Sequence, residues 1–166
     1  MGQRLAELGV LGRFAIDFVV ARDDAGRWQT YAIEINLRKG GTTHPYLFLQ
    51  FLTEGEFDEG EGVFRAPSGV KKYYVASDHL EDTLYRAITP QHLIDILIRH
   101  RLHFDQARQT GIIVHMLATI SENGRFGVVA VSDSPEQAEE LYHRMQTIVR
   151  DEARQAIRAP ALPEPK

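Results

Sequence analysis

Three oxygen-bearing side chains in the first quarter of the chain have types and spacing that suit a magnesium ion. Asp17 lies in one alternating run of residues, and Glu34 and Asn36 lie two apart in the next. The segment Asp23-Asp24-Ala25-Gly26 separates the two runs, and such a segment predicts a β-hairpin. A turn centred on Ala25-Gly26 places Asp17 directly opposite Glu34, with Asn36 on the next diagonal. Carboxylate and amide oxygens are ligands that Mg²⁺ accepts when phosphate and water complete its octahedron.

The two faces of this predicted hairpin differ in character. Two carboxylates directly opposite one another repel unless a cation lies between them or one is protonated. The alternative is that Asp17 and Glu34 simply face solvent, as most charged strand residues do. The other face is apolar and is expected to cover a core; it carries Phe14, Ile16, Phe18, Val20, Tyr31, Ile33, Ile35 and Leu37.

The loop after the second run suits an anion. Gly40-Gly41 allows close backbone approach, and Thr43 with Pro45 predicts the start of a helix over 45–53. A helix N-terminus attracts phosphate, and Arg38 and Lys39 add positive charge beside it. The alternative is an ordinary turn followed by a well-capped helix.

Composition excludes several classes of function. The 166 residues are 43% hydrophobic and 25% charged, with a net charge of −4 and no cysteine. A disulfide framework and a thiolate metal site are therefore impossible. The dispersed basic residues predict no nucleic-acid or membrane partner, and no apolar run is long enough to span a bilayer. Because no secretory signal is visible, we expect a cytoplasmic protein.

The second half of the chain predicts a smaller unit of helices and strands. Thr89-Pro90 and Ser134-Pro135 each predict a helix start, and Asn123-Gly124 predicts the turn of a hairpin between them. Residues 54–69 read as a surface loop. We therefore expect an α+β fold: an antiparallel hairpin sheet with helices, followed by a small helix–hairpin–helix lobe. The expected domains are 1–86 and 87–158, with a disordered tail over 159–166.

Several of these segments resemble a known family. The pattern Asp17…Glu34-x-Asn36 before a Gly-rich loop resembles the metal-binding end of the ATP-grasp ligases. The string EINLRKGGTTHPY is similar to the carboxylate–amine and peptide ligases related to the pheganomycin-type peptide ligase. The second half of the chain resembles the C-terminal domain of that subgroup through the strings YYVASDHLEDTLYRAITPQHLIDIL, LHFD and TGIIVHML…GRFGVVAVSDSPEQAEELY. Together the resemblance covers residues 9 to 152.

The resemblance implies an ATP-dependent ligase that joins a carboxylate to an amine through an acyl phosphate. Residues 1–86 would be the C-terminal half of an ATP-grasp domain, with ATP as co-substrate. Mg²⁺ or Mn²⁺ would be held by Asp17, Glu34 and Asn36, and Arg38 would steady the transferred phosphoryl group. Contacts to the nucleotide would come from Ile33, Lys39, Gly40 and Gly41. One departure is Ala15, where the family's dipeptide ligases tend to carry arginine; Arg13 lies two residues earlier.

Lysines are few, and no segment corresponds to the nucleotide-binding lobe that precedes the metal hairpin in the family. We therefore expect that this lobe acts in cis or in trans, and that the chain alone is inactive; a homo-oligomer is a further expectation. Two alternatives stay open at this point. The chain could be a non-enzymatic interaction module that keeps the fold, or an unrelated small α+β protein with an acidic face.

Overall fold

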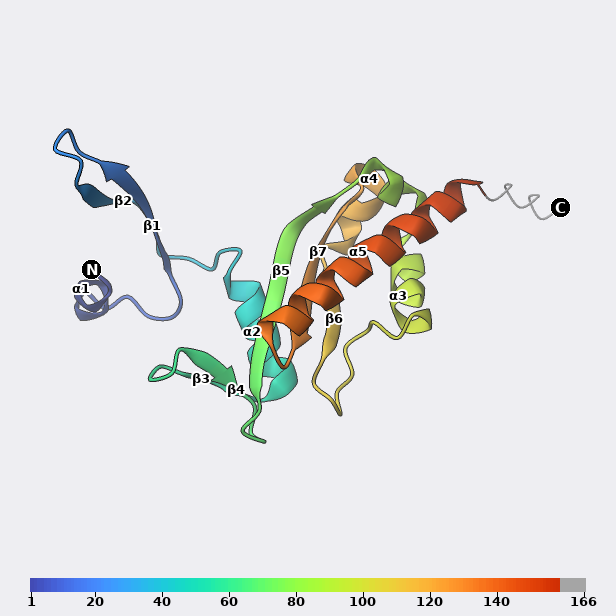
Figure 1. The fold of residues 1–166 in the computed structure, drawn as a ribbon, viewed down its shortest axis with the longest axis horizontal. Coiled ribbons are helices and arrows are strands. Elements are labelled where there is room, and N and C mark those ends of the chain that lie inside the picture. The colour runs from blue at the N-terminus through green and yellow to red at the C-terminus, as the bar shows by residue number, and fades with distance from the viewer. Residues whose placement is uncertain (159–166) are drawn as a thin grey trace. The chain divides into compact units, whose positions relative to one another are not determined.

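The computed structural model describes residues 1–158, which divide into a unit over Met1–Leu47 and a second unit that begins at Phe48. The first unit contains helix α1 (Gly2–Glu7) and strands β1 (Ala15–Arg22) and β2 (Trp28–Asn36), as Figure 1 shows. The two strands form an antiparallel two-stranded sheet. Helix α2 (Thr43–Thr53) starts in the first unit and ends in the second.

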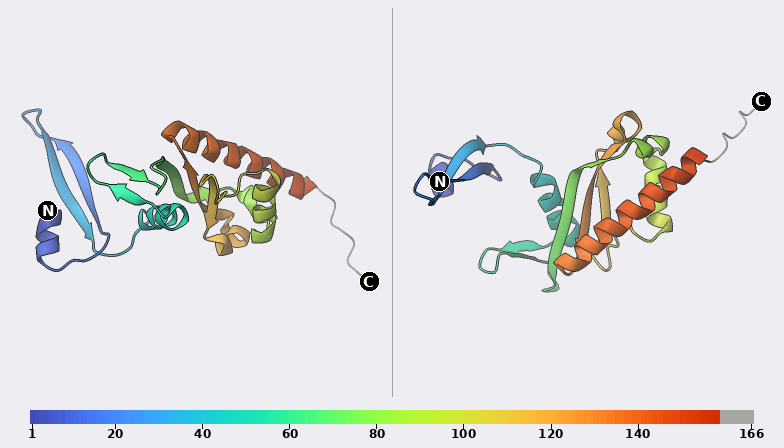
Figure 2. Two further views of the ribbon diagram at one scale, coloured as in Figure 1. Left: turned by 90° about the horizontal axis from the view of Figure 1, so that it is seen from below. Right: turned by 45° about the horizontal axis from the view of Figure 1, so that its top comes forward.

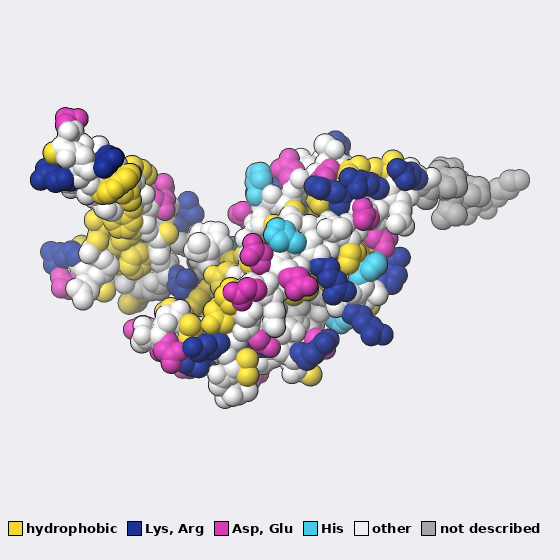
Figure 3. Space-filling view, in the orientation of Figure 1, with side chains coloured by type: hydrophobic (Ala, Val, Ile, Leu, Met, Phe, Trp, Pro, Cys, Tyr) yellow, Lys and Arg dark blue, Asp and Glu magenta, His cyan; other side chains and the backbone are white. Residues whose placement is uncertain are grey.

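The hairpin exposes most of its apolar side chains. Phe18, Tyr31 and Ile33 are more than half exposed, and Figure 3 shows hydrophobic side chains gathered over the hairpin. The expectation that this face covers a core is therefore wrong for the described residues. Alternation predicted the strands correctly, but it cannot tell whether a partner element exists to bury the apolar face.

The second unit is built on a five-stranded antiparallel sheet in the order β3-β4-β5-β7-β6. Its strands are β3 (Glu56–Asp58), β4 (Val63–Arg65), β5 (Lys71–Glu81), β6 (Gly111–His115) and β7 (Arg125–Ser132). The prediction that residues 54–69 form a surface loop is thus wrong, because this segment contains β3 and β4. The Asp58 carboxylate closes their turn by accepting hydrogen bonds from the backbone N–H groups of Gly60 and Glu61.

The two predicted helix starts of the second unit are confirmed. Helix α3 (Pro90–Arg99) follows Thr89, whose hydroxyl accepts a hydrogen bond from the His92 N–H at 3.1 Å. Helix α5 (Pro135–Arg158) follows Ser134, whose hydroxyl accepts from the Gln137 N–H at 3.2 Å. Each cap satisfies an N–H group that the helix itself leaves without a partner. Across residues 1–158, no helix combines the length and apolar character needed to cross a membrane.

The connection between β6 and β7 differs from the expected hairpin turn. Met116 has a left-handed backbone, and the chain then forms the 3₁₀ turn η2 (Leu117–Thr119) and helix α4 (Ile120–Asn123). Gly124 ends α4 with φ +67°, where a side chain would collide with the Asp82 carbonyl. The Asn-Gly pair is therefore a helix C-terminus rather than a β-turn. The predicted helix–hairpin–helix lobe is not confirmed, although β6 and β7 do pair.

The core lies between the sheet and α5. One face of β7, including Val128 and Ala130, packs with Met145 and Val149 of α5, which runs along that face in Figure 2. On the opposite face the His115 ring lies 5.8 Å from the Phe48 ring of α2. His115 also fills the space beside Gly127, where any Cβ would overlap the imidazole. This histidine is therefore a packed side chain of the sheet.

The sheet spans both sides of the domain boundary predicted at residue 86, because β5 pairs with β7 along most of its length. A short 3₁₀ helix, η1 (Thr83–Ala87), occupies the boundary itself. The division into 1–86 and 87–158 stays a prediction, and the expected tail over 159–166 lies outside the described residues.

A pH-dependent contact joins α3 to α5. The Glu152 carboxylate lies 2.8 Å from His100 Nε2 and 3.1 Å from Arg99 Nη2. The hydrogen bond to His100, followed by Arg99, lowers the Glu152 pKa from its ordinary 4.5. A lowered pKa gives stability that is present above about pH 4.5 and is lost as the pH falls through the folded-state value.

Glu152→Gln should therefore lower the free energy of unfolding by about 0.5–1 kcal/mol near neutral pH. At pH values below the Glu152 pKa of both the folded and the unfolded state, the substitution should change it by almost nothing. Urea unfolding at pH 6.5 and near pH 3, which bracket the ordinary carboxyl pKa, measures the difference. An equal loss at both pH values would contradict a role for the charged carboxylate.

Candidate metal centre

The predicted pairing of the two acidic residues is confirmed. Asp17 is paired directly with Glu34, and Ala15 with Asn36. Beyond this point the register shifts, so that Phe18 lies opposite Ala32 and a β-bulge leaves Ile33 as the extra residue.

The register at the turn explains why this prediction succeeded. The last pair before the turn is Arg22 with Trp28, so the pairing register next to the turn is shifted by one residue from the expected one. Asp23 closes it, because its carboxylate accepts from the Arg27 N–H at 2.8 Å and its own N–H donates to the Arg27 carbonyl. The bulge at Ile33 shifts the register back by one residue. Asp17 therefore lies opposite Glu34, as the sequence predicted.

The three oxygen-bearing side chains lie on one face of the hairpin. Asn36 Nδ2 donates to Asp17 Oδ2 at 3.4 Å, and directly opposed residues such as Asp17 and Glu34 share a face. Both carboxylates are exposed and Asn36 is half-buried. Among residues 1–158, no lysine, arginine or histidine forms an ion pair with either acid. The pair therefore lacks a compensating cation from the described chain.

This donor set fits a magnesium ion that shares its ligands with a substrate. Mg²⁺ is usually held by one or two carboxylates, with water and phosphate oxygens completing the octahedron. Rotation of the Asn36 amide by a half-turn would present its oxygen in place of Nδ2, because the amide carries an acceptor on one side and a donor on the other. The described residues contain no group of three or more His, Asp or Glu side chains that could hold a metal on their own. The hairpin thus offers part of a coordination sphere rather than a complete cage.

The loop that follows β2 is tied to the start of α2. The Gly40 N–H donates to the Thr43 hydroxyl at 3.1 Å, and the Thr43 N–H donates to the Gly40 carbonyl at 3.0 Å. Helix α2 therefore begins at Thr43, two residues before the predicted start. Space beside Gly40 is open, because a Cβ there would meet nothing within 4 Å.

The remaining predicted site residues are exposed. Arg38 Nη1 donates to the Lys39 carbonyl at 3.4 Å. Lys39 and Gly41 are exposed, and Ile33 is 63% exposed at the bulge. Roles in nucleotide or phosphoryl binding stay predictions for all of them. Arg13, the stand-in for the family's missing arginine, lies with its guanidinium 3.7 Å from the centre of the Tyr46 ring.

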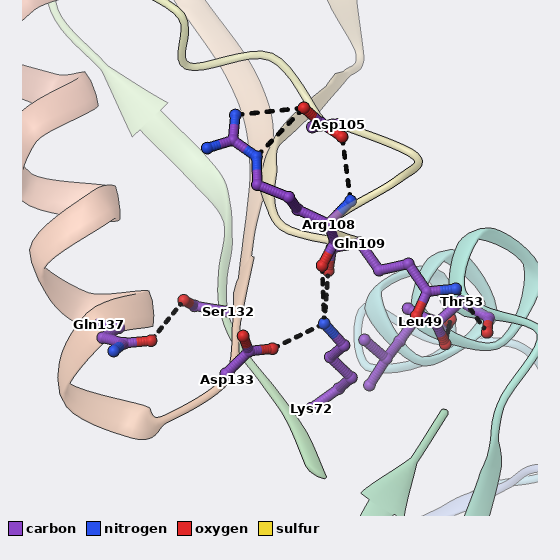
Figure 4. A network of polar contacts seen from close by, with 9 residues as sticks. All are labelled: Leu49, Thr53, Lys72, Asp105, Arg108, Gln109, Ser132, Asp133 and Gln137. Carbon is purple, nitrogen blue, oxygen red and sulfur yellow. Dashed lines mark hydrogen bonds and ion pairs between the residues drawn. The ribbon is translucent and has the colours of Figure 1, made fainter. Parts of the chain in front are cut away.

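A buried lysine in the second unit was not singled out by the sequence. Lys72 Nζ donates to the backbone carbonyls of Arg108 and Gln109 at 3.0 and 3.1 Å, and to Asp133 Oδ1 at 2.6 Å (Figure 4). Gln109 Nε2 in turn donates to the Thr53 carbonyl at the end of α2. The network joins four segments that are far apart in the sequence. Only its position in an apolar strand could have suggested that this lysine is buried.

Comparisons with known proteins agree with the resemblance seen in the sequence. Residues 92–145 match the model of the PGM1 C-terminal domain. Over 148 residues the chain is 29% identical to L-propargylglycine–L-glutamate ligase of Streptantibioticus cattleyicolor. That alignment covers 89% of this chain but 30% of the ligase. No solved structure matches the chain. The chain is therefore similar to this ligase over most of its own length, and residues 92–145 are similar to the PGM1 C-terminal domain.

Proposed function

We propose that this chain is the metal- and ATP-binding C-terminal portion of an ATP-dependent carboxylate–amine ligase. The observation that carries the proposal is the direct opposition of Asp17 and Glu34, with Asn36 on the same face and, within residues 1–158, no ion pair from a cationic side chain to either acid. Similarity to a ligase that joins two amino acids supports the same conclusion. Because the chain spans 30% of that relative, the proposal includes a nucleotide-binding lobe supplied in cis or in trans.

In this reaction class, ATP phosphorylates a carboxylate, and the amine nitrogen attacks the acyl carbon and expels phosphate. The products are an amide, ADP and phosphate. Asp17, Glu34 and Asn36 would hold Mg²⁺ or Mn²⁺, which neutralises charge on the phosphates when bound. Arg38 would stabilise negative charge on the transferred group. Ile33 would contact adenine, and the Lys39–Gly41 backbone would approach the phosphates.

A second candidate is an interaction module without activity. The exposed apolar face of the hairpin favours it, because large exposed apolar patches often mark interaction surfaces. The two candidates differ in one respect: an inactive module has no need of a divalent cation.

We expect Mg²⁺ to raise the melting temperature of the chain, followed at the hairpin unit, by about 3–6 °C at a concentration near ten times its Kd. Trp28, the single tryptophan, lies in β2, so its fluorescence reports this unit. Asp17→Asn combined with Glu34→Gln should abolish the rise. The same double variant should be slightly more stable than the parent without Mg²⁺, because it removes a like-charge pair.

Asp24→Asn with Glu59→Gln is a matched control, because it removes the same charge from exposed acids elsewhere. This control should keep the full rise. An unchanged rise in the Asp17 and Glu34 variant would place the ion elsewhere and overturn the proposed metal site. Efficient amide formation by the purified 166-residue chain would contradict the need for a second lobe.

A further inference from the structure

A surface hollow of about 290 Å³ lies in the second unit, at the junction of α3, the loop before β6 and the first turns of α5. Its polar lining includes Arg101, Arg108, Thr110, Ser132, Gln137 and Arg144. We propose that this arginine hollow binds an oxyanion, the carboxylate or phosphate group of a small ligand. The proposal is independent of the metal centre, because all of these residues lie in the second unit.

The charges of the hollow are unbalanced. Three arginines line it and Glu140 is the one acidic residue in its lining. Within the described chain, neither Arg101 nor Arg144 has a carboxylate within 4 Å, whereas Arg99 and Arg154 pair with Glu152 and Asp151. Guanidinium groups present planar pairs of N–H donors that match carboxylate and phosphate oxygens. An oxyanion in the hollow would supply the partner that residues 1–158 do not.

Arg101 occupies a costly backbone position. Helix α3 ends in a Schellman motif: the Leu102 N–H donates to the Leu97 carbonyl and the Arg101 N–H to the Ile98 carbonyl. This motif places Arg101 at φ +54°, a left-handed conformation in which glycine is strongly preferred. Arg101 therefore places a long cationic side chain at a backbone position where glycine would be more stable. Such an outlier at the edge of a hollow is a reason to infer a binding role.

The neighbouring polar groups are held in place. Asp105 accepts a hydrogen bond from the Ala107 N–H group. It also accepts from the Arg108 N–H and pairs with the Arg108 guanidinium at 3.1 Å (Figure 4). The buried Ser132 hydroxyl donates to Gln137 Oε1 at 3.1 Å, which leaves the Gln137 amide N–H₂ available as a donor. Gln137 lies in the first turn of α5, where the helix dipole also favours negative charge. Oriented donors lose less entropy when a ligand binds.

The test is a ¹H–¹⁵N NMR titration of the full chain with succinate and with inorganic phosphate, at constant ionic strength. We expect saturable shifts of the Thr110, Gly111 and Gln137 amides, with a Kd in the millimolar range. Tighter binding of succinate would identify the ligand group as a carboxylate, and tighter binding of phosphate would identify it as a phosphoryl group. Either result supports an oxyanion site.

Three variants sharpen the test. Arg101→Gly and Arg144→Gln should each weaken binding by about tenfold, whereas Arg154→Gln, a charge-matched change on the same helix, should leave it unchanged. Arg101→Gly should also raise the melting temperature by about 2–4 °C, because glycine relieves the left-handed strain. Its loss of binding therefore cannot come from unfolding. Equal shifts with sodium chloride, no saturation by about 50 mM ligand, or equal weakening in Arg154→Gln would overturn the proposal.

Discussion

Replacing Lys72 by methionine is expected to lower the free energy of unfolding by about 2–3 kcal/mol. The lysine side chain is 3% exposed, and its ammonium group satisfies two backbone carbonyls and the Asp133 carboxylate. Methionine fills similar volume but donates nothing, so the carbonyls of Arg108 and Gln109 lose their partner. Asp133 is 48% exposed and can be rehydrated, which keeps the loss below that of a fully buried ion pair.

Lys71→Met is the matched control for this prediction. Lys71 is the neighbouring residue of β5 and pairs with Glu61, but both side chains are more than 40% exposed. An exposed ion pair contributes about 0–1 kcal/mol, so the control should lose far less stability than Lys72→Met. Urea unfolding followed by far-ultraviolet circular dichroism measures both variants. Equal losses would contradict the account of Lys72 as the link between β5 and the loop before β6.

Phe126→Ala should cost about 3–5 kcal/mol, which is the largest single loss we expect. Phe126 is fully buried in β7, and its ring packs edge-on against Tyr85 with 5.4 Å between ring centres. Truncation removes this contact and leaves a cavity in the buried core, whose residues come from the sheet and from η1, α3, α4 and α5.

The comparison for that variant is Phe57→Ala. Phe57 lies in the short strand β3 and its side chain is 48% exposed, so its truncation leaves no closed cavity. We expect a loss below about 1 kcal/mol for Phe57→Ala. A loss for Phe126→Ala no greater than that of the control would contradict the assignment of the core to the interface between β7 and α5.

Local sequence signals predicted the parts of the structure that depend on neighbouring residues. Ser134 and Thr89 begin helices because each hydroxyl accepts from an N–H three residues later, a contact that needs no tertiary partner. The opposition of Asp17 and Glu34 was also predicted, although the register next to the turn was off by one residue and the bulge at Ile33 restored it. A bulge carries no simple sequence signal. The predicted pairing of Asp17 with Glu34 was therefore correct only because the bulge offset the register error at the turn.

Features that depend on distant contacts could not be read in the same way. Gly124 ends a helix rather than forming a β-turn, because the Asp82 carbonyl occupies the space beside it. Strands β3 and β4 lie in an acidic, Gly-rich segment that has little strand character of its own, and β4 is held by pairing with β5. Lys72 is buried only because Arg108, Gln109 and Asp133 converge on it from other segments. Propensity is a weak guide wherever tertiary contacts decide the outcome.

The most direct test of the proposed metal site is paramagnetic line broadening by Mn²⁺ in the NMR spectrum of the full chain. The account predicts that substoichiometric Mn²⁺ broadens the amide resonances of Asp17, Glu34 and Asn36 first. The acidic turn between β3 and β4, with Asp58, Glu59 and Glu61, is the built-in comparison. Broadening that begins at this turn, or that spreads equally over all exposed acids, would contradict a metal site on the hairpin.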